Sequence, residues 1–139
     1  MKGRREGGKR RRARETALAV LFGEEFGGGA RDELPGDLIE HLELDAPPAY
    51  ARELVEGVRS SMEELDECIS SVSHHWRVER MSLIDRNIIR IGTYEILHVD
   101  DVTTAVAINE AIEIARRYGD TDSWSFVNGV LDAVAKAAP

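Results

Sequence analysis

A run of arginines near the N-terminus carries the clearest chemical signal in the chain. It consists of Arg10, Arg11, Arg12, Ala13 and Arg14. Each guanidinium is a planar fork of N–H donors that pairs with a phosphate in bidentate fashion and also stacks on bases. The run therefore predicts binding of a nucleic acid, and the alternative is a tail that serves only solubility.

Aromatic side chains accompany arginines in two parts of the chain. Phe22 and Phe26 follow the arginine run, and Arg116-Arg117-Tyr118 together with Trp124 and Phe126 flank a tight loop. Unstacked bases of single-stranded RNA need such π-faces. However, Phe22 and Phe126 also fit the apolar stripes of core helices, so spacing alone leaves both roles open.

The residues that usually carry metal or nucleophilic chemistry form no convincing site. His74 and His75 are adjacent, so on a helix they point about 100° apart, and His41 and His98 have only acids at ligand spacing. Cys68 lies at the edge of an apolar stripe without a basic cluster beside it, which predicts a buried, inert thiol. We therefore expect no enzyme, no catalytic residue, no metal and no cofactor.

The charge of the chain is divided sharply between two segments. The 139 residues carry a net charge of −8, yet the first fourteen hold eight of the eighteen Lys and Arg against one acid. The remaining residues carry ten basic and 25 acidic side chains. Such asymmetry predicts an interaction segment on an acidic body. The single cysteine and the lack of a long apolar stretch favour a cytoplasmic protein without a membrane span.

Apolar residues recur at three- and four-residue steps through most of the chain, and no period-two pattern appears. We expect an all-α domain of about seven helices over residues 10–139, preceded by a disordered basic extension at 1–9. A Gly-rich loop at 27–36 looks unusually flexible. The expected helices are 10–26, 37–44, a long one from Pro47-Pro48 to about 72, 83–98, 103–118 and 122–136.

Several polar residues have expected structural roles. Ser82 with Asp85 resembles a capping box, and the Asp122 carboxylate can cap the last helix. Asn109 and Asn128 lie within helices, where Asn has poor propensity, so each should bond another segment or a ligand. We expect Asn109 to join adjacent helices, while for Asn128 both roles remain open.

Longer strings of residues resemble the NusB family of bacterial transcription antitermination factors. The similarity covers about 10–26 and 83–134, whereas 30–80 matches only in helical pattern. The strings are Arg10–Glu15, Asp85-Arg86, Ile88–Glu95, Ala107–Ala115 and Phe126–Asp132.

The resemblance implies an all-helical RNA-binding adaptor built from two small helical bundles. Members of the family bind the single-stranded boxA element of ribosomal RNA leader transcripts together with ribosomal protein NusE. The complex helps RNA polymerase resist termination. Some members self-associate, so a homodimer is compatible with the resemblance.

Carried over by position, the resemblance assigns two sets of contacts. The NusE-facing surface would include Glu79 and Asp85, and an acidic body suits such a basic partner. The RNA contacts would be Arg10, Arg11, Arg12, Arg14, Phe22, Tyr118, Asp122, Phe126 and Asn128.

Two alternatives to the adaptor come from other classes of protein. A NusB-like domain also occurs fused to ribosomal RNA cytosine methyltransferases, so the chain could be the RNA-binding part of such an enzyme. It could also be a purely structural interaction module whose basic segment serves solubility.

Overall fold

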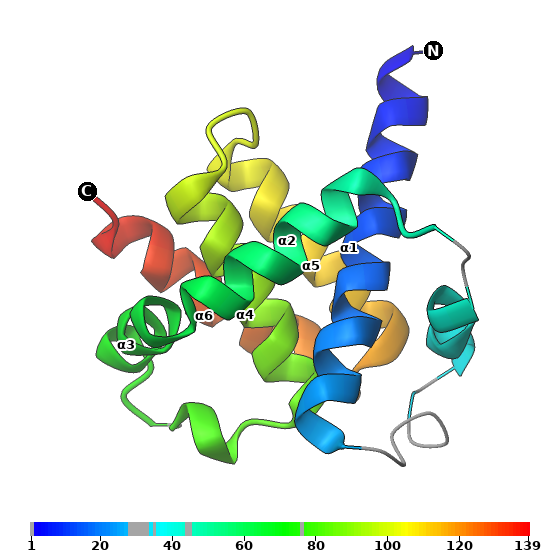
Figure 1. Cartoon of the computed structure of the whole chain (residues 1–139). Helices are drawn as coiled ribbons and strands as arrows, with labels where there is room; N and C mark the ends of the chain where they lie inside the picture. Colours follow the sequence, from blue (N-terminus) through cyan, green and yellow to red (C-terminus); the bar gives the residue numbers. More distant parts are fainter. Residues whose placement is uncertain (1, 28–33, 35, 44–45, 76) are drawn as a thin grey trace.

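The computed structural model describes residues 2–27, 34, 36–43, 46–75 and 77–139, and every regular element among them is a helix. This confirms the all-α prediction. The elements, with η for a 3-10 helix, are α1 (Lys2–Phe26), η2 (Gly36–Glu43), α2 (Ala49–Ser60), α3 (Met62–Val72), η3 (Val78–Arg80), α4 (Leu83–His98), α5 (Thr104–Tyr118) and α6 (Ser123–Ala137) (Figure 1).

Helix α1 begins at Lys2 rather than near Arg10, and its N-terminal turns project beyond the other helices (Figure 1). The structure thus differs from the disordered segment expected at 1–9. Residues 2–9 contain no proline, and extending an existing helix costs much less than nucleating one, even with three glycines at about 1 kcal/mol each. The division of the chain into an extension and a domain at residue 10 stays a prediction.

The long helix expected from Pro47-Pro48 to about residue 72 is in fact two helices, which is a correction. The break lies at Ser61, with φ −107° and ψ 11°, and the Ser61 N–H bonds the Gly57 carbonyl. The Ser60 hydroxyl donates to the same carbonyl at 3.3 Å, a local bond that competes with the helical ladder. Tyr94 of α4 approaches the backbone of α2 closely at Gly57, where a Cβ would lie 2.2 Å from Cζ of Tyr94.

Helix α4 is the element that the rest of the fold surrounds. It contacts α1 and α2 on one side and α3, α5 and α6 on the other, so two small bundles share one central helix. Ile89 of α4 and Leu131 of α6 are fully buried in a continuous apolar core. Gly92 permits this approach, since a Cβ there would lie 2.7 Å from Cδ1 of Leu131.

The capping prediction for α4 is confirmed. The Ser82 hydroxyl accepts a hydrogen bond from the Asp85 N–H at 3.1 Å, which fixes the first turn of the helix. At the start of α5 the Thr103 hydroxyl does the same for Val106 at 3.2 Å. These caps fix the first turns of α4 and α5.

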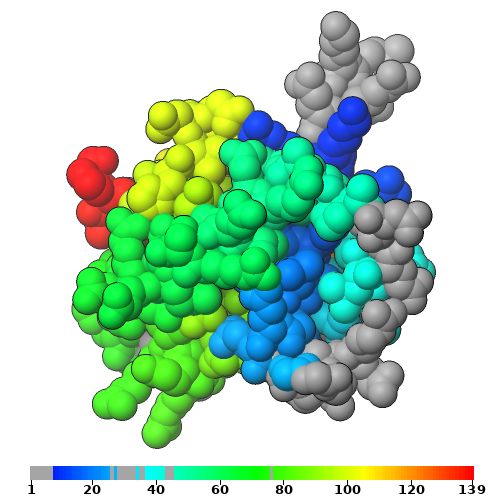
Figure 2. Space-filling model, in the orientation of Figure 1, coloured from blue at the N-terminus to red at the C-terminus, as the bar shows by residue number. Residues whose placement is uncertain are grey.

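On one face of the molecule, α2 and α3 form a continuous surface beside the middle part of α1 (Figure 2). Among the described residues, no helix is long and apolar enough to cross a membrane. Most of the Gly-rich segment expected at 27–36 lies outside the described residues. Gly27 ends α1 with a φ of +93°, a conformation that favours glycine.

Candidate nucleic-acid interface

Two of the predicted RNA-binding arginines are held by carboxylates of the body. Arg10 donates to both oxygens of Asp101 in the α4–α5 connection, at 3.4 and 2.7 Å. Arg11 makes a bidentate pair with Glu110 of α5, at 3.0 and 2.7 Å. The hydrogen bond from Arg10 holds the pKa of Asp101 below its usual range, so that carboxylate stays charged. Both guanidinium groups remain partly exposed beside their partners.

Arg14 lies inside the fold, with a relative exposure of 2%. Its Nε donates to both oxygens of Glu95 at 3.0 and 2.9 Å, and its Nη1 donates to Glu110 at 3.2 Å. The Tyr50 hydroxyl of α2 also donates to Glu95. Burial raises the pKa of Glu95, and Arg14 and Tyr50 only partly offset this effect. The side chain therefore joins α1 to α4 and α5, and its expected contact with RNA stays a prediction.

Phe22 and Tyr118, both expected to contact RNA, lie in the core of the fold, and their contact with RNA stays a prediction. Each is only 5% exposed and belongs to the apolar core. The Tyr118 hydroxyl donates to Asp37 of η2 at 2.9 Å. Both side chains fill space in the core at helical positions where large apolar groups are needed.

Arg12 differs from its neighbours because it points away from α4 and α5. Its side chain is exposed and has no ion pair with any residue that the structure describes. Lys9, one turn earlier, is exposed as well. Arg12 lines a hollow with Glu15, Asp37 and Glu40, but none of these pairs with it, so a phosphate can reach Arg12 without displacing an ion-pair partner among the described residues.

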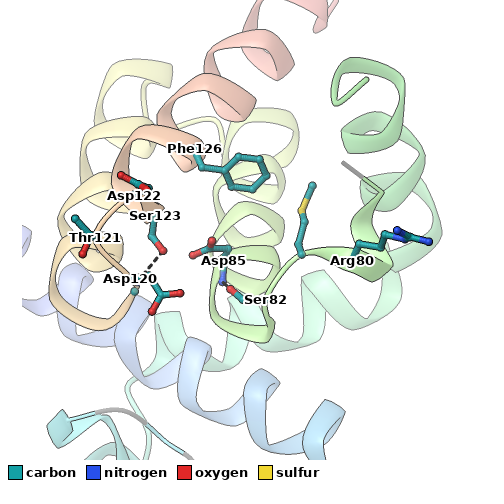
Figure 3. Close-up of a pocket in the computed structure, with 10 residues that line it drawn as sticks. Arg80, Ser82, Asp85, Asp120, Thr121, Asp122, Ser123 and Phe126 are labelled. Atoms are coloured by element: carbon teal, nitrogen blue, oxygen red, sulfur yellow. Dashed lines mark hydrogen bonds between the residues drawn. The ribbon is translucent and has the colours of Figure 1, made fainter. Parts of the chain in front are cut away.

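A second feature is an open pocket of about 960 Å³ where the α5–α6 loop faces the start of α4. Figure 3 shows the Phe126 ring extending over it, with Asp85, Asp120 and Ser123 gathered close together. The Asp120 N–H donates to the Ser123 hydroxyl at 2.9 Å, which closes the loop. The pocket combines one aromatic face with several acceptors, a set that suits the edge and face of a base or a basic side chain.

Asp85 brings a buried carboxylate oxygen to this pocket. Its Oδ1 is buried and has no hydrogen-bond partner among the described residues. Burial raises the pKa of the Asp85 carboxyl, which the hydroxyls of Ser123 and Ser82 offset only in part. A donor brought by a ligand or partner would satisfy this oxygen and favour its charged form.

The remaining predicted site residues lie on the surface. Asp122 precedes α6 and lines the pocket, but its side chain makes no cap hydrogen bond, so the expected capping role is wrong. Asn128 is exposed on α6, and Glu79 is exposed on η3 beside the pocket-lining Arg80. Asn109 is exposed too and bonds no described segment, so its expected role in joining helices is wrong.

His41 and His98 make ordinary contacts within the fold, whereas His74 and His75 are exposed. His41 Nδ1 lies 2.7 Å from the Thr16 hydroxyl, and His98 Nε2 lies 2.6 Å from Glu64. Cys68 is half-buried, and burial raises the pKa of its thiol. Within the part of the chain that the structure describes, no three His, Cys, Asp or Glu residues are grouped to hold a metal ion.

Sequence reasoning missed the partners that restrain the arginines. Asp101, Glu95 and Glu110 lie more than eighty residues further along the chain, and no local pattern marks them as partners of α1. Trp124 also lies near arginines in the sequence, but its spacing does not distinguish it from the core aromatics. It is 40% exposed, and the Arg116 guanidinium carbon lies 4.7 Å from its ring centroid.

Together, the fold and the site define a class: an all-helical binding protein with an arginine-bearing helix and a polar pocket beside it. The chain belongs to the NusB family, whose model matches residues 11–136.

Relatives agree with this assignment over nearly their whole lengths. The chain is 48% identical to the transcription antitermination protein NusB of Desulforudis audaxviator, covering 92% of this chain and 94% of the relative. It is also 48% identical to that of Bdellovibrio bacteriovorus, covering 92% and 96%.

Solved structures support the same fold. NusB of T. maritima superposes with a TM-score of 0.76 at 40% identity, covering 93% of this chain and 92% of that one. A crystal structure of antitermination factors NusB and NusE in complex with dsRNA gives a TM-score of 0.72 at 27% identity, covering 93% and 97%.

Proposed function

We propose that this chain is a transcription antitermination factor that binds single-stranded boxA RNA of ribosomal RNA leader transcripts together with ribosomal protein NusE. The assembly helps RNA polymerase resist termination, and it acts in the cytoplasm on nascent transcripts. Family membership and the related complex of NusB, NusE and RNA support this proposal. It is a binding function, with no catalytic step assigned to any residue.

The observation that carries the proposal is the composition of the pocket in Figure 3. Asp122 and Phe126, expected to face RNA, line the same pocket as Asp85, expected to face NusE. The RNA-facing surface and the NusE-facing surface meet in this pocket, so RNA and NusE can bind at the same time. Each bound ligand can then add contacts to the other. This arrangement fits an adaptor that binds RNA more tightly when its protein partner is present.

The phosphate contacts belong to the exposed side of α1. We assign them to Arg12 first, and to Arg10 and Arg11 in competition with their carboxylates. Asn128 remains assigned to the RNA side and Glu79 to the NusE side, and both are exposed. Arg14, Phe22 and Tyr118 hold α1 and α5 in place and act on RNA only through that positioning.

Fluorescence anisotropy of a labelled boxA-type strand, with a scrambled strand as the comparison, tests the proposal. If three phosphates are neutralised on a single strand, the log–log salt slope should be about −2, and affinity should fall roughly fifteenfold between 50 and 200 mM salt. Arg12→Gln should weaken binding and reduce the slope by about 0.7. The matched control, Lys136→Gln, removes an exposed charge near the end of α6 and should change neither.

The second measurement repeats the RNA titrations in the presence of NusE. Adding it should tighten binding of the boxA-type strand more than that of the scrambled strand. Asp85→Asn should reduce this gain while leaving RNA binding by the chain alone nearly unchanged. Equal binding of both strands, with no effect of NusE, would refute the proposed function.

A further inference from the structure

The last turn of α5 and the first turn of α6 present a stacked pair of side chains to solvent. Trp124 is 40% exposed, and the guanidinium of Arg116 lies over its ring, with its Cζ 4.7 Å from the centroid. Among the described residues, Val106 is the other large hydrophobic side chain with comparable exposure, at 46%. Exposing an indole to water is unfavourable, so its position on the surface calls for an explanation.

Structural roles do not account for Arg116. The adjacent Arg117 pairs with Glu15 and Asp37, which ties α5 to α1 and η2. Arg116, in contrast, has no ion pair and no side-chain hydrogen bond with any described residue. Its only described interaction is the stack on Trp124, so its N–H donors remain available to a ligand.

The pair is continuous with the arginine-bearing face of α1. Arg116 and Arg117 line a shallow hollow of about 250 Å³ together with Arg11. Trp124 lies two residues before Phe126 on α6, so the two side chains point about 200° apart, and of the two Phe126 is the one that lines the pocket at the start of α4. The pair therefore lies beside the hollow that Arg11 also lines.

We propose that Arg116 and Trp124 form a stacking platform for one unpaired base of a bound RNA strand. The inference rests on the proposed function, because it presumes that the chain binds single-stranded RNA. An indole face and a guanidinium plane both stack on bases, and the guanidinium can also pair with a neighbouring phosphate. The platform adds affinity with little sequence preference, since every base has a π-face.

The surrounding charge favours RNA over a protein at this position. Three arginines lie around the hollow beside the platform: Arg11 is paired with Glu110, Arg117 is paired with Glu15 and Asp37, and Arg116 has no carboxylate partner among the described residues. The unpaired charge of Arg116 disfavours a basic protein such as NusE at this position. An RNA strand that leaves the arginines of α1 meets the platform with complementary charge.

Trp124→Leu and Trp124→Phe separate stacking from simple apolar contact, and Val106→Ser is the matched control for an exposed apolar residue. Val106 lies about 15 Å along α5 from Arg116, given the rise of an α-helix. We expect Trp124→Leu to weaken binding of a labelled boxA-type strand about tenfold, and Trp124→Phe to retain most of the affinity. Val106→Ser should bind like the parent.

The salt dependence distinguishes a stacking residue from a phosphate contact. Trp124→Leu should lower affinity at every salt concentration and leave the log–log slope unchanged, whereas Arg12→Gln should reduce the slope by about 0.7. Circular dichroism checks that the helical content of each variant equals that of the parent.

The outcomes separate this inference from the proposed function. If the parent binds no single-stranded RNA, both are wrong. If the parent binds but Trp124→Leu binds equally well, the platform is wrong and the proposed function stands. If Trp124→Leu loses affinity for NusE while keeping that for RNA, the surface serves a protein and the platform is also wrong.

Discussion

Neutralising Glu110 should make this chain bind RNA more tightly. Its carboxylate accepts two hydrogen bonds from Arg11 and a third from Arg14. A phosphate that approaches Arg11 must share the guanidinium with this carboxylate or displace it. Glu110→Gln keeps the size of the side chain and one acceptor oxygen, but removes the negative charge that competes for Arg11.

The expected gain comes from two contributions. The Arg11 side chain is 45% exposed and that of Glu110 15%, so freeing Arg11 from the pair contributes about 0.5–1 kcal/mol. Repulsion between Glu110 and a phosphate at roughly 7 Å in water adds about 0.6 kcal/mol, and salt reduces it. Together these terms predict about five- to fifteenfold tighter binding at low salt.

Anisotropy titrations with a labelled boxA-type strand at 50 mM salt measure this gain. Glu113→Gln is the matched control, because Glu113 is an exposed acid one turn further along α5 that makes no ion pair with a described residue. It removes the same charge without freeing an arginine, so its gain should stay below about threefold. The slope for Glu110→Gln should stay near about −2, because Arg11 is already one of the three phosphate contacts and the variant removes only the carboxylate that competes for it.

The reasoning fails if Glu110→Gln binds RNA no more tightly than Glu113→Gln does. That result would mean that the carboxylate holds Arg11 in its binding position rather than competing for it. Urea denaturation checks that the fold is retained, since Arg14 keeps its bonds to Glu95 and the loss of stability should be about 1 kcal/mol.

Three further predictions concern the fold that presents the arginines. Arg14→Met should lower the free energy of unfolding in urea by about 3–5 kcal/mol, because it leaves Glu95 buried without its charged partner. A double variant that also replaces Glu95 by Leu should recover part of this stability. Gly92→Ala should cost about 1–3 kcal/mol, since the new Cβ would lie 2.7 Å from the buried Leu131; unchanged stability would show that Leu131 can move aside. Burial raises the pKa of Glu25, but hydrogen bonds and charges from α4 lower it by more, so the folded pKa lies below the ordinary value of 4.5. The stabilisation is therefore present above about pH 4.5 and lost as the pH falls further, and Glu25→Gln should flatten the acid limb of a denaturation curve.

Local sequence signals were sufficient for most helices and for their caps. Ser82 caps α4 as its spacing predicts, and the apolar periodicity places α5 and α6 within a residue or two. The signals failed where tertiary contacts decide the outcome. The break at Ser61 interrupts an apolar stripe that continues across it, so the stripe does not reveal the break, and the approach of Tyr94 to Gly57 leaves no local pattern either.

The candidate site was less predictable than the fold, for a physical reason. An aromatic residue beside arginines suits both a core and a nucleic-acid surface, and burial alone separates Phe22 from Trp124. Likewise, the four arginines of the run on α1 are neighbours in the sequence but differ in function, because only some of them form ion pairs with carboxylates of the body. Residues so distant in the chain leave no local mark on the segment they pair with.

The acidic body thus has two effects on the same arginines. Through Glu95, Glu110 and Asp101 it fixes α1 against α4 and α5, so the helix enters any complex already ordered and loses little entropy on binding. The same carboxylates reduce the number of arginines that meet a phosphate without competition, and this lowers nonspecific affinity for polyanions. A strand that offers only phosphates must therefore bind against that competition, whereas a strand that also fills the pocket at Asp122 and Phe126 gains contacts that do not depend on Arg10 or Arg11. A small adaptor can discriminate among RNA strands when its affinity for the RNA phosphates is moderate and a separate pocket binds the bases.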